Sequence, residues 1–388
     1  MRILHTSDWH LGRSFHREGM LTHQAAYVDH LLAVVESERV DLVVVAGDVY
    51  DRALPQVDAV RLADESLVRL ARSRAQVVLT SGNHDSAQRL GFSSRLIDAA
   101  GVFIRTDAAT VGTPVGLADE HGPVAVYGLP YLDPLALAEP WALEVRSHEA
   151  ALATAMGKVR RDLTSRPGTR SVVLAHAFVA GGQPSESERD ISVGGVSRVS
   201  TSVFDGVDYA ALGHLHGAQT LTDRVRYSGS PLAYSFSETH QTKGSWLVDL
   251  AADGSVTAEL VEAPVPRRLA RITGDLETLL ADPDLDHAEA CWVHVTITDA
   301  VRPAHPMERL RRRFPHTLVL AFEPRGADVP SVPTARPGAR SDHDIALEFV
   351  RELRGSSATP AESALLQQAC DACTDDSDVD TLLSVGAR

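Results

Sequence analysis

Five short polar segments, far apart in the sequence, each follow a run of apolar residues of the kind that forms a β-strand. Loops at the carboxyl ends of strands lie side by side in an open α/β sheet, so we expect the segments to meet. All five carry aspartate, asparagine or histidine side chains, which bind metals and transfer protons. They are Asp8-Trp9-His10, Gly47-Asp48-Val49-Tyr50-Asp51, Gly82-Asn83-His84-Asp85, the isolated His176 and Gly213-His214-Leu215-His216.

The N-terminal part of the chain alternates strand and helix patterns, which is typical of a layered α/β domain. The continuous apolar run that ends at Ala46 predicts a strand covered on both faces. The predicted strands are Arg2 to Ser7, Asp41 to Ala46, Gln76 to Thr80, Pro123 to Leu129, Ser171 to His176 and Tyr209 to Gly213, and the predicted helices are Tyr27 to Glu38 and Val57 to Ser73.

A second, smaller unit follows the interruption at Pro264 and Pro266. Its pattern is βαβ-like, with strands from Cys291 to Ile297 and Leu318 to Phe322 around a helix from Met307 to Arg313. We expect a main domain of residues 1–265, a small α/β domain of residues 266–325, a linker of residues 326–343 and a helical tail of residues 344–388.

The tail should contain two helices, Ile345 to Arg354 and Pro360 to about Cys373. The sequence Thr359-Pro360-Ala361-Glu362 predicts a capping box with proline at the first helical position. Ile345, Phe349, Val350 and Leu353 fall on one face of the first helix. Two short helices cannot bury such faces completely against each other, so we expect the tail to offer apolar surface to a partner.

The composition sets broad limits on the class of protein. No signal peptide or membrane span is recognisable, and 3 cysteines cannot build a disulfide framework. We therefore expect a soluble, cytoplasmic protein. The formal net charge of −15 argues against a nucleic-acid partner. Two divalent cations held by aspartates would nevertheless leave a local surplus of positive charge, which weakens that argument.

The residue types in the five segments are those that hydrolysis of a phosphodiester needs. Two metal ions about 3.5–4 Å apart supply a nucleophile and neutralise the phosphate charge. Asp48 is the candidate for the carboxylate that bridges them, with Asp8, His10 and one of the late histidines on one metal. Asn83, His176 and the other late histidine would complete the second metal. Mixed nitrogen and oxygen ligands suit manganese, iron or zinc.

His84 is the candidate general acid because it directly follows the proposed ligand Asn83. Asp85 beside it would favour the imidazolium, which could protonate the leaving oxygen. The five segments in this order resemble the motifs of the calcineurin-like metallophosphoesterases. The sequence is similar in particular to the SbcD family of bacterial exonuclease subunits, on Met1 to Gly12, Val45 to Asp51, Gly82 to Ser86, Leu212 to His216 and Tyr227 to Pro231.

The resemblance implies a two-sheet sandwich flanked by helices, with a small α/β capping domain and a helical tail. It places Asp8, His10, Asp48 and His216 on one metal, most often Mn²⁺, and Asp48, Asn83, His176 and His214 on the other. It further implies a nuclease that acts on duplex ends, hairpins and single strands of DNA in repair and recombination. The implied partner is an SbcC-type, SMC-like ATPase, bound by the tail, in a heterotetramer that contains a homodimer of this subunit at the nucleoid.

Basic residues near the site and in the small domain are candidates for contact with DNA phosphates. They are Arg13, His16, Arg17, Arg52, Arg309, Arg311, Arg312 and Arg313. Two other functions remain open at this stage. One is a stand-alone phosphodiesterase for a nucleotide or other small phosphoester. The other is a non-catalytic scaffold that has lost its metals.

Overall fold

The structure is a computed structural model of the chain, and it describes residues 1–189, 191, 199–325 and 341–374. The chain divides into two compact units, Met1–Arg325 and Gly326–Arg388. The predicted linker, residues 326–343, lies outside the described residues up to residue 340, as do residues 375–388 of the predicted tail.

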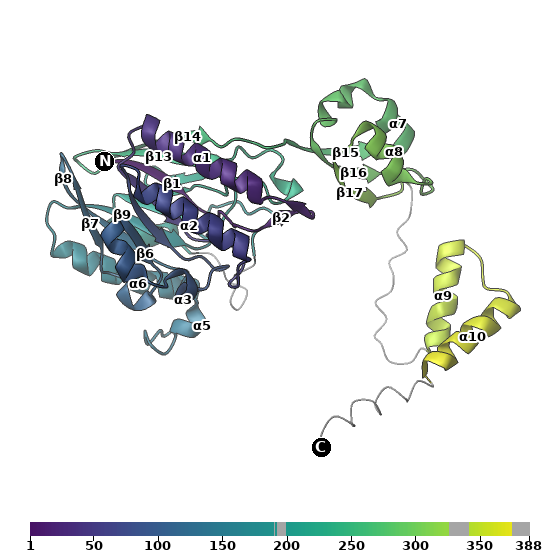
Figure 1. Cartoon of the computed structure of the whole chain (residues 1–388). Coiled ribbons are helices and arrows are strands. Elements are labelled where there is room, and N and C mark those ends of the chain that lie inside the picture. Colours follow the sequence, from purple (N-terminus) through teal and green to yellow (C-terminus); the bar gives the residue numbers. More distant parts are fainter. Residues whose placement is uncertain (190, 192–198, 326–340, 375–388) are drawn as a thin grey trace, which may run out of the picture. The chain divides into compact units, whose positions relative to one another are not determined.

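Two six-stranded sheets form the main part of the first unit (Figure 1). The first sheet has the order β14-β13-β1-β4-β5-β6 and the second β11-β12-β10-β9-β8-β7. The strands of the first sheet are β1 (Arg2–Thr6), β4 (Leu42–Ala46), β5 (Gln76–Thr80), β6 (Val102–Arg105), β13 (Gly244–Leu250) and β14 (Val256–Glu262). Those of the second are β7 (Val115–Asp119), β8 (Gly122–Gly128), β9 (Arg170–His176), β10 (Tyr209–Gly213), β11 (Gln219–Thr222) and β12 (Val225–Tyr227).

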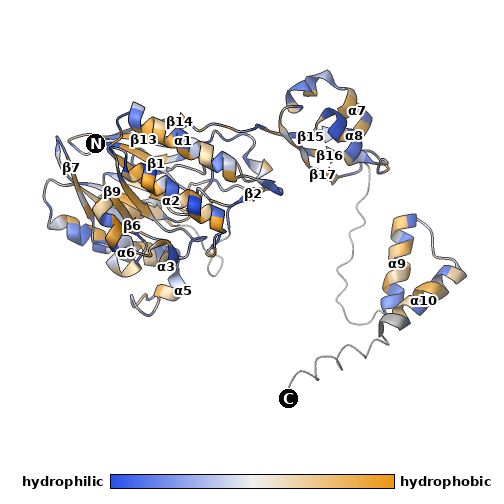
Figure 2. Ribbon diagram, in the orientation of Figure 1, coloured by the Kyte–Doolittle hydropathy of each residue, from blue (hydrophilic) through white to orange (hydrophobic). Residues whose placement is uncertain are grey.

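The five strands that precede the polar segments run parallel to one another within each sheet. In the first sheet β1, β4 and β5 pair in parallel, and in the second β9 and β10 do so. The two sheets pack face to face through a shared apolar core that includes Ile3, Val44, Val78, Leu174 and Ala211. Figure 2 shows their strands as mostly hydrophobic, as expected for strands that are covered on both faces.

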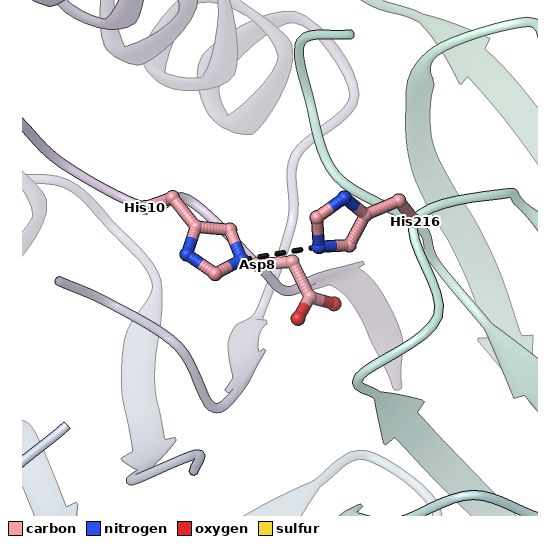
Figure 3. A group of neighbouring side chains, drawn as sticks. All are labelled: Asp8, His10 and His216. Atoms are coloured by element: carbon pink, nitrogen blue, oxygen red, sulfur yellow. Dashed lines mark hydrogen bonds between the residues drawn. The ribbon is translucent and has the colours of Figure 1, made fainter. Parts of the chain in front are cut away.

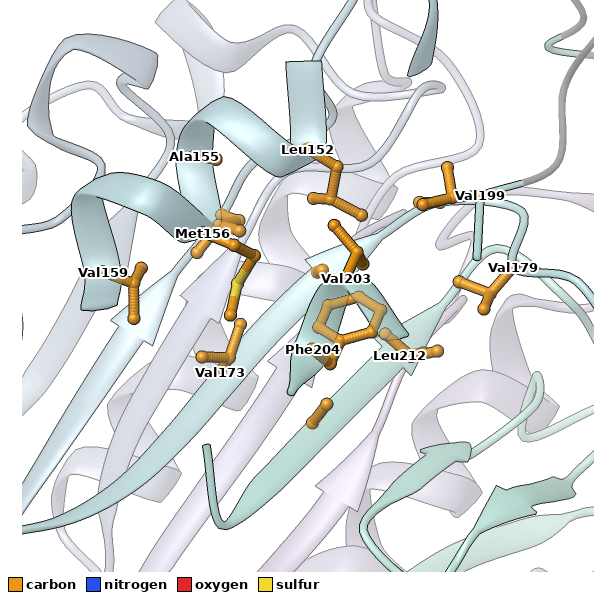
Figure 4. Packing of buried hydrophobic residues seen from close by; sticks show 14 of the residues in the cluster. Leu152, Ala155, Met156, Val159, Val173, Val179, Val199, Val203, Phe204 and Leu212 are labelled. Carbon is orange, nitrogen blue, oxygen red and sulfur yellow. The ribbon is translucent and has the colours of Figure 1, made fainter. Parts of the chain in front are cut away.

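Helices cover the outer faces of this sandwich, which gives four layers. Helices α1 (Leu21–Ser37) and α2 (Val57–Ala71) pack on the first sheet, in a core with Leu31 and Leu70. Helix α6 (His148–Thr164) packs on the second sheet, where Met156 meets Val173 (Figure 4). The shorter elements are β2 (Ser14–Phe15), β3 (Glu18–Gly19), α3 (Ala87–Leu90), α4 (Ser94–Ile97), α5 (Pro134–Leu137) and the 3-10 turns η1 (Asp98–Ala100), η2 (Ala108–Thr110), η3 (Thr201–Phe204) and η4 (Phe236–Glu238).

The small α/β part of the first unit contains a three-stranded parallel sheet in the order β15-β16-β17. Its elements are β15 (Leu269–Gly274), α7 (Leu276–Ala281), η5 (Pro283–Ala288), β16 (Trp292–Ile297), α8 (Pro306–Arg313) and β17 (Thr317–Phe322). Neither β15 nor α7 was predicted from the sequence. An aromatic cluster joins this sheet to the sandwich, because Trp292 packs with Phe15 and Phe236.

The second unit contains α9 (Asp342–Arg354) and α10 (Pro360–Thr374). The predicted capping box is present, since Glu362 N donates to Thr359 Oγ1 at 3.4 Å and Thr359 N donates to the Glu362 carboxylate at 2.7 Å. Helix α9 begins at Asp342, three residues before the predicted start at Ile345. A second capping box, formed by Ser341 and Asp344, sets this earlier start and was not recognised in the sequence.

The other predicted elements lie close to the observed ones, and β5 and β10 have the predicted bounds. Helix α1 begins at Leu21 and not at Tyr27, at an N-terminus without a side-chain cap that could have marked it. Strands β6, β7, β11, β12, β13 and β14 and helix α6 were not predicted. Among the described residues, no helix is long and apolar enough to cross a membrane.

Close packing between the sheets makes Gly213, the last residue of β10, intolerant of a side chain. A Cβ there would overlap the carbonyl oxygen of Ala46 at the end of β4. We expect Gly213→Ala to lower the free energy of unfolding by about 1–3 kcal/mol or more. Gly116→Ala, in β7 of the same sheet, is the control because a Cβ there meets nothing within 4 Å. Equal denaturant midpoints for the two variants would contradict this close approach.

Candidate metal centre

All five polar segments lie at the carboxyl ends of β1, β4, β5, β9 and β10, so the strands bring them to one place. Three of the turns hold a non-glycine residue at positive φ: Asp8 at 53°, Asp48 at 50° and His214 at 105°. This conformation is unfavourable for residues with a Cβ and is concentrated at functional sites. The backbone N–H of Asp8 donates to the Gly47 carbonyl at 3.0 Å, which ties the first two turns together.

Glycines in these turns allow the polar side chains to approach the backbone. A Cβ on Gly47 would overlap the ring of His176, and one on Gly82 would overlap the carboxylate of Asp48. The glycines of the motifs are therefore required by the packing of the site itself.

Asp8, His10 and His216 form one candidate ligand group (Figure 3). They offer ligand atoms that all lie within 4.8 Å of one another, and all three residues are buried. The Nε2 atoms of His10 and His216 face each other at 3.1 Å. Two imidazole nitrogens this close both point at the space that a metal ion would take.

Asp48 lies between this group and a second one. Its Oδ2 is 3.6 Å from His10 Nε2 and 3.4 Å from His176 Nε2. The same carboxylate oxygen therefore faces ligand candidates of both groups, which is the geometry that a bridging ligand requires. Its other oxygen accepts a hydrogen bond from the backbone N–H of His84 at 2.8 Å.

The second group gathers around Asn83. Its Oδ1 is 2.9 Å from His176 Nε2 and 3.2 Å from His214 Nδ1. The Nδ1–H of His176 donates to the Ala46 carbonyl at 2.9 Å, so Nε2 is the nitrogen that faces Asn83 and Asp48. The structure thus brings all seven predicted ligand side chains together in two groups that share Asp48.

Buried charge dominates the electrostatics of these residues. Burial opposes ionisation of Asp48, but the nearby His176 and His10 outweigh it and hold the pKa of the carboxyl well below its usual range. Burial likewise disfavours the charged form of His176, yet Asp48 raises the pKa of His176 to about 9. Burial and the charge of Asp48 raise the pKa of Asp8. Two buried carboxyls side by side call for positive charge, which His176 supplies here and metal ions would supply better.

The atoms that face one another at the centre also fit a metal ion. His10 Nε2, His216 Nε2 and Asn83 Oδ1 are turned toward the other candidate ligands, whereas His10 Nδ1 and Asn83 Nδ2 are not the atoms that would bind. The donor set of imidazole, carboxylate and amide oxygen suits first-row divalent ions such as Mn²⁺.

His84 lies at the rim of the site. Its ring meets that of His10 edge-on, with centroids 4.7 Å apart. Its Nδ1–H donates to the Asp51 carbonyl at 2.8 Å, which leaves Nε2 for exchange of a proton with a substrate. His84 also lines a cavity of about 630 Å³ together with Arg13, Arg52 and Arg189.

Asp85 has other partners than the sequence predicted. Its carboxylate accepts hydrogen bonds from the backbone N–H groups of Val49, Tyr50 and Gly82 at 3.1, 2.9 and 2.9 Å. Burial and Asp48 raise the pKa of this carboxyl to about 7. The hydrogen bonds join the second and third turns, so Asp85 orients the backbone around Asp48 instead of charging the ring of His84.

The basic residues near the site differ in exposure. The side chain of Arg13 is held in place by two contacts. Its Nη2 donates to the Ser187 carbonyl at 2.8 Å, and its guanidinium lies 4.8 Å over the Tyr234 ring. His16 and Arg17 are exposed at the tip of the β2–β3 hairpin, both at positive φ. The side chain of Arg52 is 79% exposed. Arg17 and Arg52 are therefore exposed to solvent at this rim, whereas Arg13 is held in place.

The four arginines of α8 are partnered within the small α/β part. Arg313 is the most enclosed of them, with only 14% of its side chain exposed. The partners are Glu277 for Arg309, the Thr317 carbonyl for Arg311, Glu308 for Arg312, and Asp286 and Glu289 for Arg313. The cluster therefore carries less unpaired positive charge than the sequence indicated.

Several buried polar residues behind the ligands were missed in the sequence. Ser187 and Glu188 both contact His216, and Glu238 and Lys243 form a buried ion pair behind them. They belong to loops and the short turn η4 that carry no periodic pattern. In the sequence they appear only as charged or hydroxyl side chains in loops, which is too common a feature to single them out.

Two family models match the chain. The model described as calcineurin-like phosphoesterase matches residues 1–218, which include all seven candidate ligands. The model described as type 5 capsule protein repressor C-terminal domain, also labelled SbcD_C, matches residues 265–345. The second match covers β15 to β17 with their helices and reaches the start of α9.

Three solved structures are among those that are similar to this chain. TT1561 of Thermus thermophilus is 12% identical with a TM-score of 0.39, over 67% of this chain and 98% of that one. A novel archaeal phosphodiesterase is 12% identical with a TM-score of 0.31, over 67% and 100%. GAP50 of the Plasmodium inner membrane complex is 14% identical with a TM-score of 0.41, over 68% and 84%. Similarity at TM-scores below 0.5 does not identify a function.

Metal binding should stabilise the fold, because the site buries Asp8 and Asp48 close together. We expect Mn²⁺ at one hundred times its dissociation constant to add about 2.7 kcal/mol to the free energy of unfolding. A chelator should remove this gain. Asp48→Ala should abolish it, since the shared ligand is lost. A melting temperature of the unaltered protein that does not respond to Mn²⁺ or chelator would contradict the metal centre.

Proposed function

The chain belongs to the calcineurin-like phosphoesterase family, and we propose that it is a metal-dependent DNA nuclease subunit that works with an SbcC-type ATPase. The family implies a phosphoester hydrolase that uses divalent metals. The observation that carries the proposal is the pairing of a two-group metal centre with the SbcD_C match that follows it in the same chain. A stand-alone phosphodiesterase for small phosphoesters has no need of that second part.

The proposed ligands are Asp8, His10, Asp48 and His216 for one Mn²⁺, and Asp48, Asn83, His176 and His214 for the other. When bound, two such ions neutralise charge on the phosphate and provide a nucleophile at neutral pH. His84 then transfers a proton from Nε2 to the leaving oxygen of the sugar, while the carbonyl of Asp51 holds its Nδ1–H. Asp85 keeps the turn around Asp48 in the conformation that this arrangement needs.

The proposed substrate is DNA, bound across the rim of the site. Supporting this, the cavity beside His84 is lined by Arg13, Arg52 and Arg189 and is large enough for parts of a nucleotide. Arg17 and Arg52 are exposed there and can contact backbone phosphates. The arginines of α8 contribute less, because acidic residues and a backbone carbonyl already hold them.

The proposed partner surface for the ATPase lies on α9. Ile345, Phe349 and Leu353 follow one another at intervals of four residues, and their exposed fractions are 53%, 60% and 72%. Such a stripe is the kind of apolar surface that docks on another helix. Helix α10 adds Leu365, which is 65% exposed.

We also propose that two copies of the chain pair. Val57, Val60 and Val68 lie on one face of α2 and are 66%, 42% and 40% exposed. Apolar side chains gathered on one helix face favour association with a second protein surface. A homodimer would place two nuclease sites in one complex with the ATPase.

The direct test of the proposed function is digestion of linear duplex, single-stranded and hairpin DNA with Mn²⁺, with and without the ATPase and ATP. We expect nucleotides to be released from duplex ends and hairpins to be opened. A protein that hydrolyses a small chromogenic phosphodiester but none of these DNAs, alone or with the ATPase, would be a stand-alone phosphodiesterase. A protein that hydrolyses neither would be a scaffold.

Substitution of Asp48 and of His84 should affect bound metal and turnover differently. Asp48→Ala removes a ligand shared by both metals, so bound metal and activity should fall together. His84→Gln removes a proton donor and no ligand, so bound metal should stay while turnover falls by about 10²- to 10⁴-fold. Metal content and initial rates measured on the same preparations separate the two. Full turnover by His84→Gln would exclude His84 from the mechanism.

Substitution of the α9 stripe should separate the ATPase from the nuclease. Phe349→Asp with Leu353→Asp places charge on the proposed docking face, and Arg351→Ala, at a position 61% exposed on the same helix, is the control. We expect the double variant to keep metal content and single-strand cleavage. It should lose co-purification with the ATPase and ATP-dependent cutting of duplex ends. Unchanged affinity for the ATPase would exclude this face as the docking site.

A further inference from the structure

The ring of His216 is held in place by side chains, whereas that of His176 is held by the backbone. His176 Nδ1–H donates to the backbone carbonyl of Ala46. Every residue has this carbonyl, so a side-chain substitution at position 46 would not remove it. His216 Nδ1 instead lies 2.6 Å from Ser187 Oγ. The orientation of one metal-facing imidazole therefore depends on a residue outside the five motifs.

The contacts of Ser187 set the direction of these hydrogen bonds. Ser187 Oγ lies 2.5 Å from Glu238 Oε1, and an ionised carboxylate can only accept, so the hydroxyl of Ser187 donates to Glu238. The oxygen of Ser187 then accepts from Nδ1–H of His216. This leaves the lone pair of His216 on Nε2, the atom that faces His10 Nε2 at 3.1 Å.

Burial keeps this chain of hydrogen bonds in one arrangement. Ser187, His216 and Glu238 are 9%, 1% and 2% exposed, and Lys243 is 5% exposed. Lys243 forms an ion pair with the Glu238 carboxylate and donates to the His216 carbonyl at 2.8 Å. A buried carboxylate is costly unless it is paired, so Lys243 keeps Glu238 ionised as an acceptor.

Further contacts hold the backbone of the same ligand. Glu188, next to Ser187, accepts the backbone N–H of His216 on Oε1 at 2.8 Å. Its other oxygen accepts from the N–H and hydroxyl of Ser185 at 2.8 and 2.7 Å. The segment from Ser185 to Glu188 thus contacts His216 at both its ring and its backbone.

We propose that Ser187 and Glu238 are positioning residues that, with Lys243, fix the tautomer and ring orientation of His216 and thereby set the affinity of one metal subsite. The inference rests on the proposed function, because it takes His216 as a ligand. The partner of a metal-binding histidine orients the ring and raises its basicity, and loss of such a partner lowers metal affinity roughly 10- to 100-fold. His176 has a backbone partner, so the orientation of its ring lacks this dependence.

The test is titration of the metal-free, full-length protein with Mn²⁺ by calorimetry, with electron paramagnetic resonance to detect a coupled pair of ions. For Ser187→Ala we expect one of two binding constants to weaken roughly 10- to 100-fold while the other stays unchanged. The coupled-pair signal should then appear only at higher Mn²⁺. Ser187→Thr keeps the hydroxyl and should bind both Mn²⁺ ions as tightly as the unaltered protein.

Ser171→Ala is the matched control. Ser171 is a buried serine whose hydroxyl donates to the Asp208 carboxylate at 3.0 Å, on β9 but away from the ligands. If Ser187→Ala binds both ions as tightly as Ser171→Ala, the hydrogen bond between Ser187 and His216 has no role in metal binding. Equal losses in Ser187→Ala and Ser187→Thr would also overturn it, because the hydroxyl would not be the cause.

Circular dichroism in chelator shows whether each variant is folded before the titration. Glu238→Gln keeps a hydrogen-bond acceptor but removes the charge, and it gives a second measure. It should weaken the same Mn²⁺-binding constant that Ser187→Ala weakens. A loss spread over both constants would contradict selective action on one subsite. Failure of the unaltered protein to bind Mn²⁺ would refute the proposed metal centre itself, so the two failures are distinguishable.

Discussion

The buried carboxylate of Asp48 is the contact on which the site depends. One of its oxygens faces His10 and His176, and the other accepts the N–H of His84. Both sheets contribute, since Asp48 follows β4 and His176 ends β9. The two sheets can deliver these groups only because Gly47 and Gly82 leave room for them. The sandwich core and the site are therefore consequences of the same close approach.

The parts of this arrangement that the sequence predicted share one physical cause. A polar residue directly after a buried parallel strand must lie at the sheet edge, so strand prediction alone brought Asp8, Asp48 and His176 together. Short apolar runs predicted β5 and β10 with their observed bounds. In the same way, Thr359 and Glu362 predicted a helix start because a capping box is a local interaction.

What the sequence did not reveal depends on contacts between distant loops. Asp85 follows His84 in the chain, yet its carboxylate turns to the backbone of Val49 and Tyr50. The arginines of α8 looked like a free basic cluster because their acidic partners, such as Glu277 and Asp286, come from other elements. Ser187 and Glu238 stand 51 residues apart and have no pattern in common. Hydrogen bonds of this kind follow from the tertiary structure and leave no periodic signal.

The short turn η4 shows how closely the two family-matched parts of the chain are built together. Phe236 at its start packs with Phe15 and lies in one cluster with Trp292 of β16, which belongs to the small α/β part. Glu238 at its end accepts the hydrogen bond of Ser187, and through it holds the ring of His216. One turn of three residues thus fixes both the aromatic contact with the small domain and the carboxylate behind a candidate metal ligand. A domain attached only by a flexible linker would not share such an element, so the small α/β part is structurally continuous with the site that it adjoins.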